Sequence, residues 1–420
     1  MRTHPPVRYL RVAAAAAVAL LGLVACDSGG AKSSGSGDQA NGAIAAASPS
    51  DSGPQVAMEF TGLTDGATDV PTSLELAYKA DAPTSTLELV ETNGGPVQGA
   101  WRSDKSAWVP GAQLKYGTQY TAKITATTAD GRTATKAATF TTMAKPGSTA
   151  KASTVIGDNQ VVGVAMPIIV SFSADIPKDQ RASVQKRLFV TSEPAQEGIW
   201  YWWNNREVHF RTKEYWQSGT KVQVRAAVGG LPLGGNRYGA QDLTMNFKIG
   251  AKTIMEADNT SKHLTITKNG QVLRRMPVSF GKPATPTDAG NMMVMIKNKK
   301  EVFDSSTFGR PVDGPGGYRK DVFWTQRLSW SGEYLHAAPW SEGDQGKRNV
   351  SNGCTNLSNA DAEWLYNQTQ VGDPVIIKGT EEHVKWQDGY THWDRSFADY
   401  AKGSAIPLGQ PDASPALLRS

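Results

Sequence analysis

The sequence predicts a mainly β protein, with two β-sandwiches of immunoglobulin-like size followed by a third, β-rich domain with one short helix. Apolar and polar residues alternate over short runs that Gly, Pro, Asn and Asp interrupt. A faint internal repeat recurs about a hundred residues along the chain. The first helix signal appears only near Ser358. The length of 420 residues suits two to three domains, and 39% apolar with 20% charged residues is ordinary globular composition.

Residues 1–25 have the layout of a secretory signal peptide. Arginines near the start precede an apolar run from Val12 to Ala25, which is too short to span a bilayer as a stable helix. The run ends in small residues followed by Cys26, which looks like a bacterial lipobox. The sequence therefore predicts a lipoprotein, anchored to the cell membrane through acylated Cys26 on its extracytoplasmic face. An ordinary secreted protein is the alternative.

Residues 26–55 contain Ser, Gly, Ala, Asp and Pro with almost no large side chain. Such a segment cannot bury enough apolar surface to fold, so we expect a flexible tether. The net charge of +5 comes without a basic block, and it gives no reason to expect nucleic acid as a partner.

The two predicted sandwiches occupy residues 56–147 and 148–250. Strand-like alternation marks 73–78, 120–125 and 222–226. The repeat pairs Trp101, Trp108 and residues 116–124 with Trp202 or Trp203, Tyr215-Trp216 and residues 218–224. Tryptophans in such a repeat pack in a core more often than they form a sugar-stacking platform. We therefore expect the two sandwiches to act mainly as spacers, with wall binding as their second role. Core burial must hold each of them together, because neither has a cysteine pair.

The third domain spans residues 251–379, and a C-terminal extension follows at 380–420. Strands are predicted at 253–257, 263–267, 271–279, 292–296, 322–324, 334–336 and 375–378, with Lys268-Asn269-Gly270 as a hairpin turn. Ser358, with Asp361 three residues later, predicts the start of the helix.

Cysteine usage points to a reactive site in this third domain. The chain has two cysteines, and if Cys26 is lipidated, Cys354 has no disulfide partner. A free thiol in an oxidising compartment is either catalytic or an inert buried residue. His336 is the natural base for it. Gly353 permits a tight turn that would aim the Gly353 and Cys354 N–H groups at an oxyanion.

These residues resemble the L,D-transpeptidases with a YkuD-type catalytic domain, in their actinobacterial lipoprotein form with two immunoglobulin-like domains. The family pattern is a histidine followed, after a short gap, by [Ser/Thr]-His-Gly-Cys-x-Asn. His336, Ser351, Gly353, Cys354 and Asn356 match it, as do the stretches 281–290 and 336–341. The resemblance covers about residues 56 to 400.

One position departs from the pattern, because Asn352 stands where the family has histidine. Asparagine cannot act as a base, but it keeps its backbone N–H and a side-chain donor. We expect an active enzyme because His336 remains as the base.

The resemblance implies acyl transfer without a cofactor or metal. Cys354 would attack the carbonyl between the third residue and the terminal D-Ala of a donor peptidoglycan tetrapeptide, and an amine of an acceptor stem would then take the acyl group. Tyr318 would lie in a flap and help the oxyanion hole, with Ser351, Asn352 and Asn356 also at the substrate. Trp340 would line the cleft or simply pack. A backbone carbonyl, that of Ala337, would orient His336. Carbapenem-type β-lactams would be inhibitors.

Several alternatives remain open from the sequence. The acyl-enzyme could pass to water, as in a peptidoglycan carboxypeptidase or endopeptidase, or to a protein lysine. Asn352 keeps a non-catalytic wall-binding lipoprotein possible in principle. A metal site made of His336, Cys354, His383 and His392 fits no standard ligand spacing.

Overall fold

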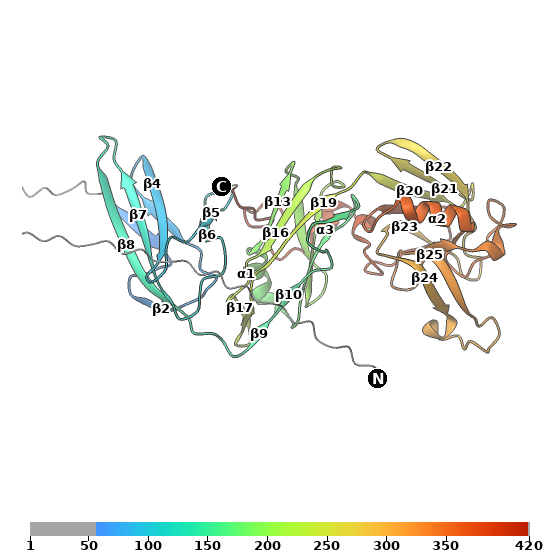
Figure 1. Ribbon diagram of the computed structural model, residues 1–420, viewed down its shortest axis with the longest axis horizontal. Coiled ribbons are helices and arrows are strands. Elements are labelled where there is room, and N and C mark those ends of the chain that lie inside the picture. The colour runs from blue at the N-terminus through green and yellow to red at the C-terminus, as the bar shows by residue number, and fades with distance from the viewer. Residues whose placement is uncertain (1–55, 419–420) are drawn as a thin grey trace, which may run out of the picture. The chain divides into compact units, whose positions relative to one another are not determined.

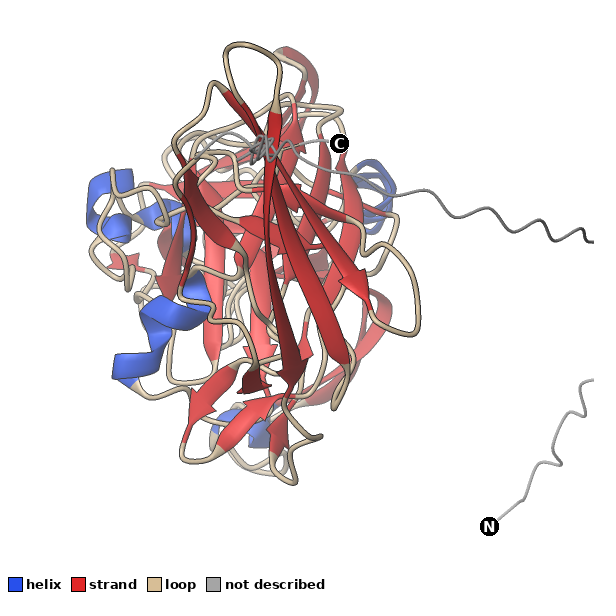
Figure 2. Cartoon of the chain, turned by 90° about the vertical axis from the view of Figure 1, so that its left-hand side faces the viewer, coloured by secondary structure: helices blue, strands red, loops and turns tan. Residues whose placement is uncertain are grey.

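The computed structural model describes residues 56–418 and confirms a mainly β protein with few, short helices (Figures 1 and 2). The predicted signal peptide, the lipidation residue Cys26 and the tether to residue 55 lie outside the described residues. Within 56–418, no helix combines the length and the apolar character that crossing a membrane requires.

The first eight strands form one four-stranded sheet, in the order β2-β8-β7-β4, and two strand pairs, β1-β3 and β5-β6. Their shared core includes Leu76, Tyr120 and Phe140. The strands are β1 (Met58–Thr61), β2 (Ala67–Val70), β3 (Ala77–Ala80), β4 (Thr84–Glu91), β5 (Gly99–Trp101), β6 (Trp108–Pro110), β7 (Gln119–Thr127) and β8 (Thr133–Thr142).

The strand expected at 73–78 begins only at Ala77. The preceding residues contact the second sandwich instead: the Thr72 hydroxyl donates to Gly229 O, and Arg187 donates to Ser73 O at 2.6 Å. Contacts with the second sandwich therefore determine the backbone at Thr72 and Ser73, although the alternating sequence there is typical of a strand.

The second sandwich has two four-stranded sheets, β10-β12-β15-β14 and β11-β19-β16-β13, and a small sheet β17-β18-β9. Two short helices, η1 (Lys178–Gln180) and α1 (Arg181–Gln185), were not predicted. The strands are β9 (Thr149–Ala150), β10 (Ala152–Ser153), β11 (Gln160–Val162), β12 (Ile168–Phe172), β13 (Leu188–Glu193), β14 (Gly198–Trp202), β15 (Glu207–Thr212), β16 (Lys221–Ala226), β17 (Pro232–Gly234), β18 (Arg237–Gly239) and β19 (Leu243–Ile249).

The internal repeat has a structural basis in both sandwiches. Gly117, before β7, has φ +58° and donates its N–H to Met143 O at 2.9 Å. Gly219, before β16, has φ +83° and donates to Ile249 O at 3.0 Å. The repeated tryptophans are mainly core residues, as predicted: Trp108, Trp202 and Trp216 are buried.

The third domain combines a six-stranded sheet, β22-β21-β20-β28-β23-β29, with a four-stranded sheet, β24-β25-β26-β27, around a core that includes Leu335 and Leu365. Its strands are β20 (Thr253–Asp258), β21 (His263–Lys268), β22 (Gln271–Pro277), β23 (Asp288–Met293), β24 (Ile296–Asp304), β25 (Arg319–Arg327), β26 (Tyr334–Ala337), β27 (Thr355–Leu357), β28 (Pro374–Lys378) and β29 (Glu382–His383). Its helices are η2 (Ser305–Phe308), η3 (Pro339–Ser341) and α2 (Asn359–Gln368).

Several local predictions for this domain are confirmed. Asn269 and Gly270 both have positive φ in the β21–β22 turn. The Ser358 hydroxyl accepts from Asp361 N at 3.1 Å and caps α2. The strand expected at 292–296 is wrong, because β23 ends at Met293 and β24 begins at Ile296. Val294 N donates to Asp373 O, just before β28, and Met295 N donates to Arg327 O at the end of β25, so the chain passes from one sheet to the other here.

The C-terminal segment runs back along the chain's earlier domains. It contains η4 (His392–Asp394) and α3 (Phe397–Ala401), and Tyr400 packs on the second sandwich, where its hydroxyl donates to His209 O. At its end, Leu418 N donates to Trp101 O in the first sandwich at 2.8 Å.

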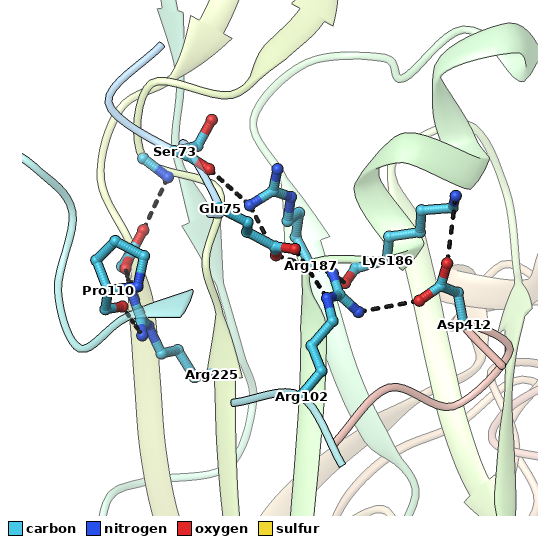
Figure 3. Close-up of polar contacts among 10 residues, drawn as sticks. Ser73, Glu75, Arg102, Pro110, Lys186, Arg187, Arg225 and Asp412 are labelled. Carbon is cyan, nitrogen blue, oxygen red and sulfur yellow. Dashed lines mark hydrogen bonds and ion pairs between the residues drawn. The ribbon is translucent and has the colours of Figure 1, made fainter. Parts of the chain in front are cut away.

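A buried ion network joins the two sandwiches and this tail (Figure 3). Arg102, 5% exposed, holds both oxygens of Glu75 at 2.8 Å and Asp412 at 3.0 Å. Arg187 forms a second ion pair with Glu75 at 2.8 Å, and Lys186 forms a second ion pair with Asp412 at 3.2 Å. Each carboxylate is thus held by two cations, which offsets its desolvation.

Candidate active site

Two neighbouring strands bring the predicted nucleophile and base together. β26 and β27 are parallel, and His336 lies directly opposite Asn356. Cys354 immediately precedes β27 and stands two residues before Asn356. The pairing of β26 with β27 therefore brings Cys354 close to the strand that carries His336.

The turn before Cys354 is held by Ser351. The buried Ser351 hydroxyl donates to Cys354 O at 2.6 Å and accepts from Gly353 N at 3.1 Å. Gly353 has φ +136°, a conformation that other residues rarely adopt. The Gly353 N–H is bonded to the Ser351 hydroxyl, which fixes the turn, and the expected role of this N–H at an oxyanion stays a prediction.

The Cys354 thiol is half-buried and donates to Gly332 O at 3.5 Å. Burial raises the pKa of Cys354, and the Glu333 carboxyl raises it further. The backbone N–H groups of Tyr334 and Cys354 act in the opposite direction and lower this pKa. The resting nucleophile is therefore a neutral thiol.

His336 is buried, and its Nδ1 lies 2.8 Å from Ala337 O, the partner that the resemblance implied. A carbonyl only accepts, so Nδ1 carries the proton and Nε2 is left as the basic nitrogen. Burial lowers the pKa of His336 to about 4. A neutral imidazole beside a neutral thiol means that proton transfer must accompany nucleophilic attack.

Aromatic side chains border the histidine. The Trp340 ring lies 6.1 Å from the His336 ring and is 53% exposed, so it is not a core residue. Tyr318 immediately precedes β25 and is half-buried. Burial raises its pKa, and the proximity of Cys354 adds to the rise. Tyr318 and Trp340 are thus both near the reactive pair.

Comparisons with known proteins show the family of this chain. Residues 252–377 match the family model of the L,D-transpeptidase catalytic domain, and residues 67–232 match that of the bacterial Ig domain. L,D-transpeptidase 2 of Mycobacterium tuberculosis is 36% identical over 345 residues, which cover 82% of this chain and 84% of that protein. The chain belongs to the L,D-transpeptidases. L,D-transpeptidase 5 of Mycobacterium tuberculosis is 33% identical over 361 residues, covering 84% of this chain and 77% of that protein. The solved structure of LD transpeptidase LdtMt1 in complex with imipenem aligns with 54% of this chain and 97% of its own, at 34% identity and a TM-score of 0.47.

The residue that departs from the motif of the L,D-transpeptidases is exposed and tethered. Lys282 Nζ donates to Asn352 Oδ1 at 2.7 Å. With its oxygen held by Lys282, the amide nitrogen of Asn352 points away from that ammonium and remains a donor. In the sequence, Lys282 is only one residue of the matching stretch 281–290. The structure shows that it contacts Asn352.

Asn356 holds the short helix η3 in place beside the active site. It is buried, and its Nδ2 donates to Ser341 Oγ at 3.1 Å. Ser341 follows Trp340 in η3. The motif asparagine of this L,D-transpeptidase therefore anchors the segment that carries Trp340, and its expected contact with substrate stays a prediction.

Two ionisable residues near the site, Glu333 and Lys320, could not be recognised from the sequence. Glu333 is buried, one oxygen accepts from Asp288 N at 3.3 Å, and Oε2 has no hydrogen-bond partner among the described residues. Burial and the nearby Asp288 hold the pKa of Glu333 well above its usual range. Lys320 is the second, and no sequence motif marks either one.

The four residues of the metal alternative do not form a cluster. His383 bonds to Asp394 at 2.8 Å and His392 to His209 at 2.8 Å, both through ring nitrogens. Across 56–418, no group of three or more His, Cys, Asp or Glu side chains is arranged to hold a metal ion.

Proposed function

We propose that this protein cross-links the third residues of two peptidoglycan stem peptides through a thioester on Cys354. The observation that carries the proposal is the pairing of β26 with β27, which brings Cys354 close to the strand of His336, with Nδ1 of His336 committed to Ala337 O. Membership of the L,D-transpeptidases supports the same chemistry.

The first step acylates the enzyme. His336 Nε2 takes the Cys354 proton as the sulfur attacks the carbonyl between the third residue and D-Ala. The C–N bond then breaks, D-Ala leaves with the proton from His336, and a thioester remains. Because both groups start neutral, no thiolate has to exist before substrate binds.

The second step transfers the acyl group. An amine of the acceptor stem attacks the thioester while His336 accepts its proton, and the Cys354 sulfur leaves and is reprotonated. The product is an amide between the two third residues. Carbapenem-type β-lactams carry a strained amide that the same thiol would open, so we propose them as inhibitors. We also propose membrane anchoring through lipidated Cys26, which would hold the enzyme beneath the wall.

Intact-mass spectrometry and product analysis test the proposal. A disaccharide-free tetrapeptide donor with an acceptor should give a cross-linked dimer, and a carbapenem should add to the wild type. Cys354→Ala should form neither product. His336→Gln should slow both by about 10²- to 10⁴-fold through loss of the base. A tripeptide without dimer would favour a carboxypeptidase, and an unmodified wild-type protein would favour a non-catalytic wall-binding role.

A further inference from the structure

We propose that Lys320 binds a free carboxylate of the stem peptide beside the nucleophile. The proposal rests on the acyl-transfer function above and assigns a substrate contact to a residue outside the sequence motif.

Strand register points Lys320 toward the active site. It lies opposite Phe303 in the antiparallel β24–β25 pair, and directly opposite residues share a face. The Phe303 ring lies 5.3 Å from the His336 ring, so this face is the catalytic one. The neighbours Arg319 and Asp321 point the other way.

The charges on the opposite face are compensated, whereas Lys320 is not. Arg319 pairs with Asp304 at 3.8 Å, and Asp321 pairs with Lys300 at 2.7 Å. Among the ion pairs of residues 56–418, none includes Lys320. Its ammonium lies 4.1 Å from the centre of the Trp340 ring and 5.6 Å from that of Tyr318.

Contacts with ring faces leave the ammonium able to bind an anion. A cation near exposed aromatic rings gains only a modest attraction, and its three N–H donors remain for hydrogen bonds. Tyr318 and Trp340 hold the ammonium on the side of the sheet where His336 lies. The stem peptide is the anion that this site would meet, because its carboxylates lie close to the scissile bond.

Lys320 also acts on the base. After burial, it is the charged group that lowers the pKa of His336. The other titratable groups around the site are the Cys354 thiol, the hydroxyls of Tyr318 and Tyr334, and the carboxyl groups of Glu301 and Glu333. Lys320 is the charged group among the causes of the lowered His336 pKa. A bound carboxylate would cancel the Lys320 charge and make His336 a better base once the donor is in place.

A donor tetrapeptide whose third residue is a diamino dicarboxylic acid carries two carboxylates near the scissile bond: that of the terminal D-Ala and the side-chain carboxylate of the third residue. Three donor tetrapeptides separate them, one with both carboxylates free and one amidated at each position. The enzyme variants are Lys320→Met, which keeps an unbranched side chain over Trp340, and Lys320→Arg, which keeps the charge. Lys300→Met is the matched control, since it removes an ion-paired lysine from the opposite face of the same strand pair.

We expect Lys320→Met to lower kcat/KM for the free donor by about tenfold or more, mainly through KM, as loss of a charged hydrogen bond implies. With the wild type, kcat/KM for one of the amidated donors should be lower by the same factor. With Lys320→Met, kcat/KM for that donor should fall no further, which identifies the carboxylate that Lys320 binds. Lys320→Arg should retain most of the rate, and Lys300→Met should match the wild type.

The pH profile gives an independent readout. The acid limb of kcat/KM reports the free enzyme, so removing the Lys320 charge should move its midpoint to higher pH. A purely structural role over Trp340 would not move it. Equal losses on all three donors, or an unmoved acid limb, would overturn the proposal. Carbapenem adduct and dimer formation by the wild type check the underlying function separately.

Discussion

Gly353→Ala is the substitution that tests the nucleophile turn most directly. Gly353 has φ +136°, and an added Cβ would lie 3.3 Å from Glu333 Oε1. Holding a non-glycine residue in such a conformation costs about 1–3 kcal/mol. If the turn relaxes to relieve this strain, Cys354 leaves its position next to Gly332 O. If the free-energy barrier to acylation of Cys354 rises by that amount, acylation slows roughly 5- to 150-fold.

The assay is the rate at which a carbapenem adduct appears by intact-mass spectrometry, measured beside thermal unfolding. Gly270→Ala is the matched control: Gly270 has φ +84°, and an added Cβ would meet nothing within 4 Å. Both variants should lose stability, but only Gly353→Ala should lose acylation rate. Wild-type acylation by Gly353→Ala, or equal slowing by Gly270→Ala, would refute the reasoning.

Three further predictions concern the surroundings of the site and the junction of the sandwiches. Asn352→His should change kcat/KM by less than about tenfold, because the exposed side chain is held by a lysine and not by the reacting groups; a hundredfold rise would mean that the family histidine shares in proton transfer. Glu333→Gln should remove a pH dependence: the raised pKa means that the folded protein keeps a proton that the unfolded chain loses, so wild-type stability falls as pH rises above about 4.5, whereas the variant lacks this slope in urea unfolding. Equal slopes in both proteins would contradict the assignment of a protonated Glu333. Arg102→Met should destabilise the sandwiches by about 3 kcal/mol, since it breaks a buried ion network, whereas Arg132→Met, at an exposed pair, should cost less than about 1 kcal/mol; thermal unfolding compares them, and equal shifts would exclude a special role for the network.

The predictions that succeeded from sequence rest on local physics. The Asn269-Gly270 turn and the Ser358 cap depend on residues a few positions apart, and the structure has both. The orientation of His336 by Ala337 O is also local, since the two are adjacent in the chain. Such features need no knowledge of the tertiary fold.

The features that the sequence did not reveal depend on distant partners. Nothing next to Glu333 in the sequence indicates that it will be buried near Gly353, because that contact arises only when β26 and β27 pair. Lys320 lies between Arg319 and Asp321, and nothing in the sequence distinguishes these charges until the register of β24 and β25 selects the face of each. Ser351 and Asn356 match the motif, yet their hydrogen bonds show that they hold the turn and η3.

The spacer interpretation also changes in one respect. Met293 of the third domain belongs to the core of the second sandwich, and Trp393 donates its indole N–H to Ala165 O at 2.8 Å. A protein that starts near Ala251 would expose this surface. The second sandwich therefore supports the fold of the catalytic domain as well as extending the chain.

The contact between Arg102 and Asp412 joins residues 310 positions apart. The ribosome makes Glu75 and Arg102 early, but the carboxylate and backbone groups that complete their environment come from residues 412 to 418. Contacts of such long sequence separation form late in folding. A protein truncated just before Asp412 would thus carry its complete catalytic motif and still lack one of the two carboxylates that hold Arg102, so damage far from the active site would appear first in the first sandwich.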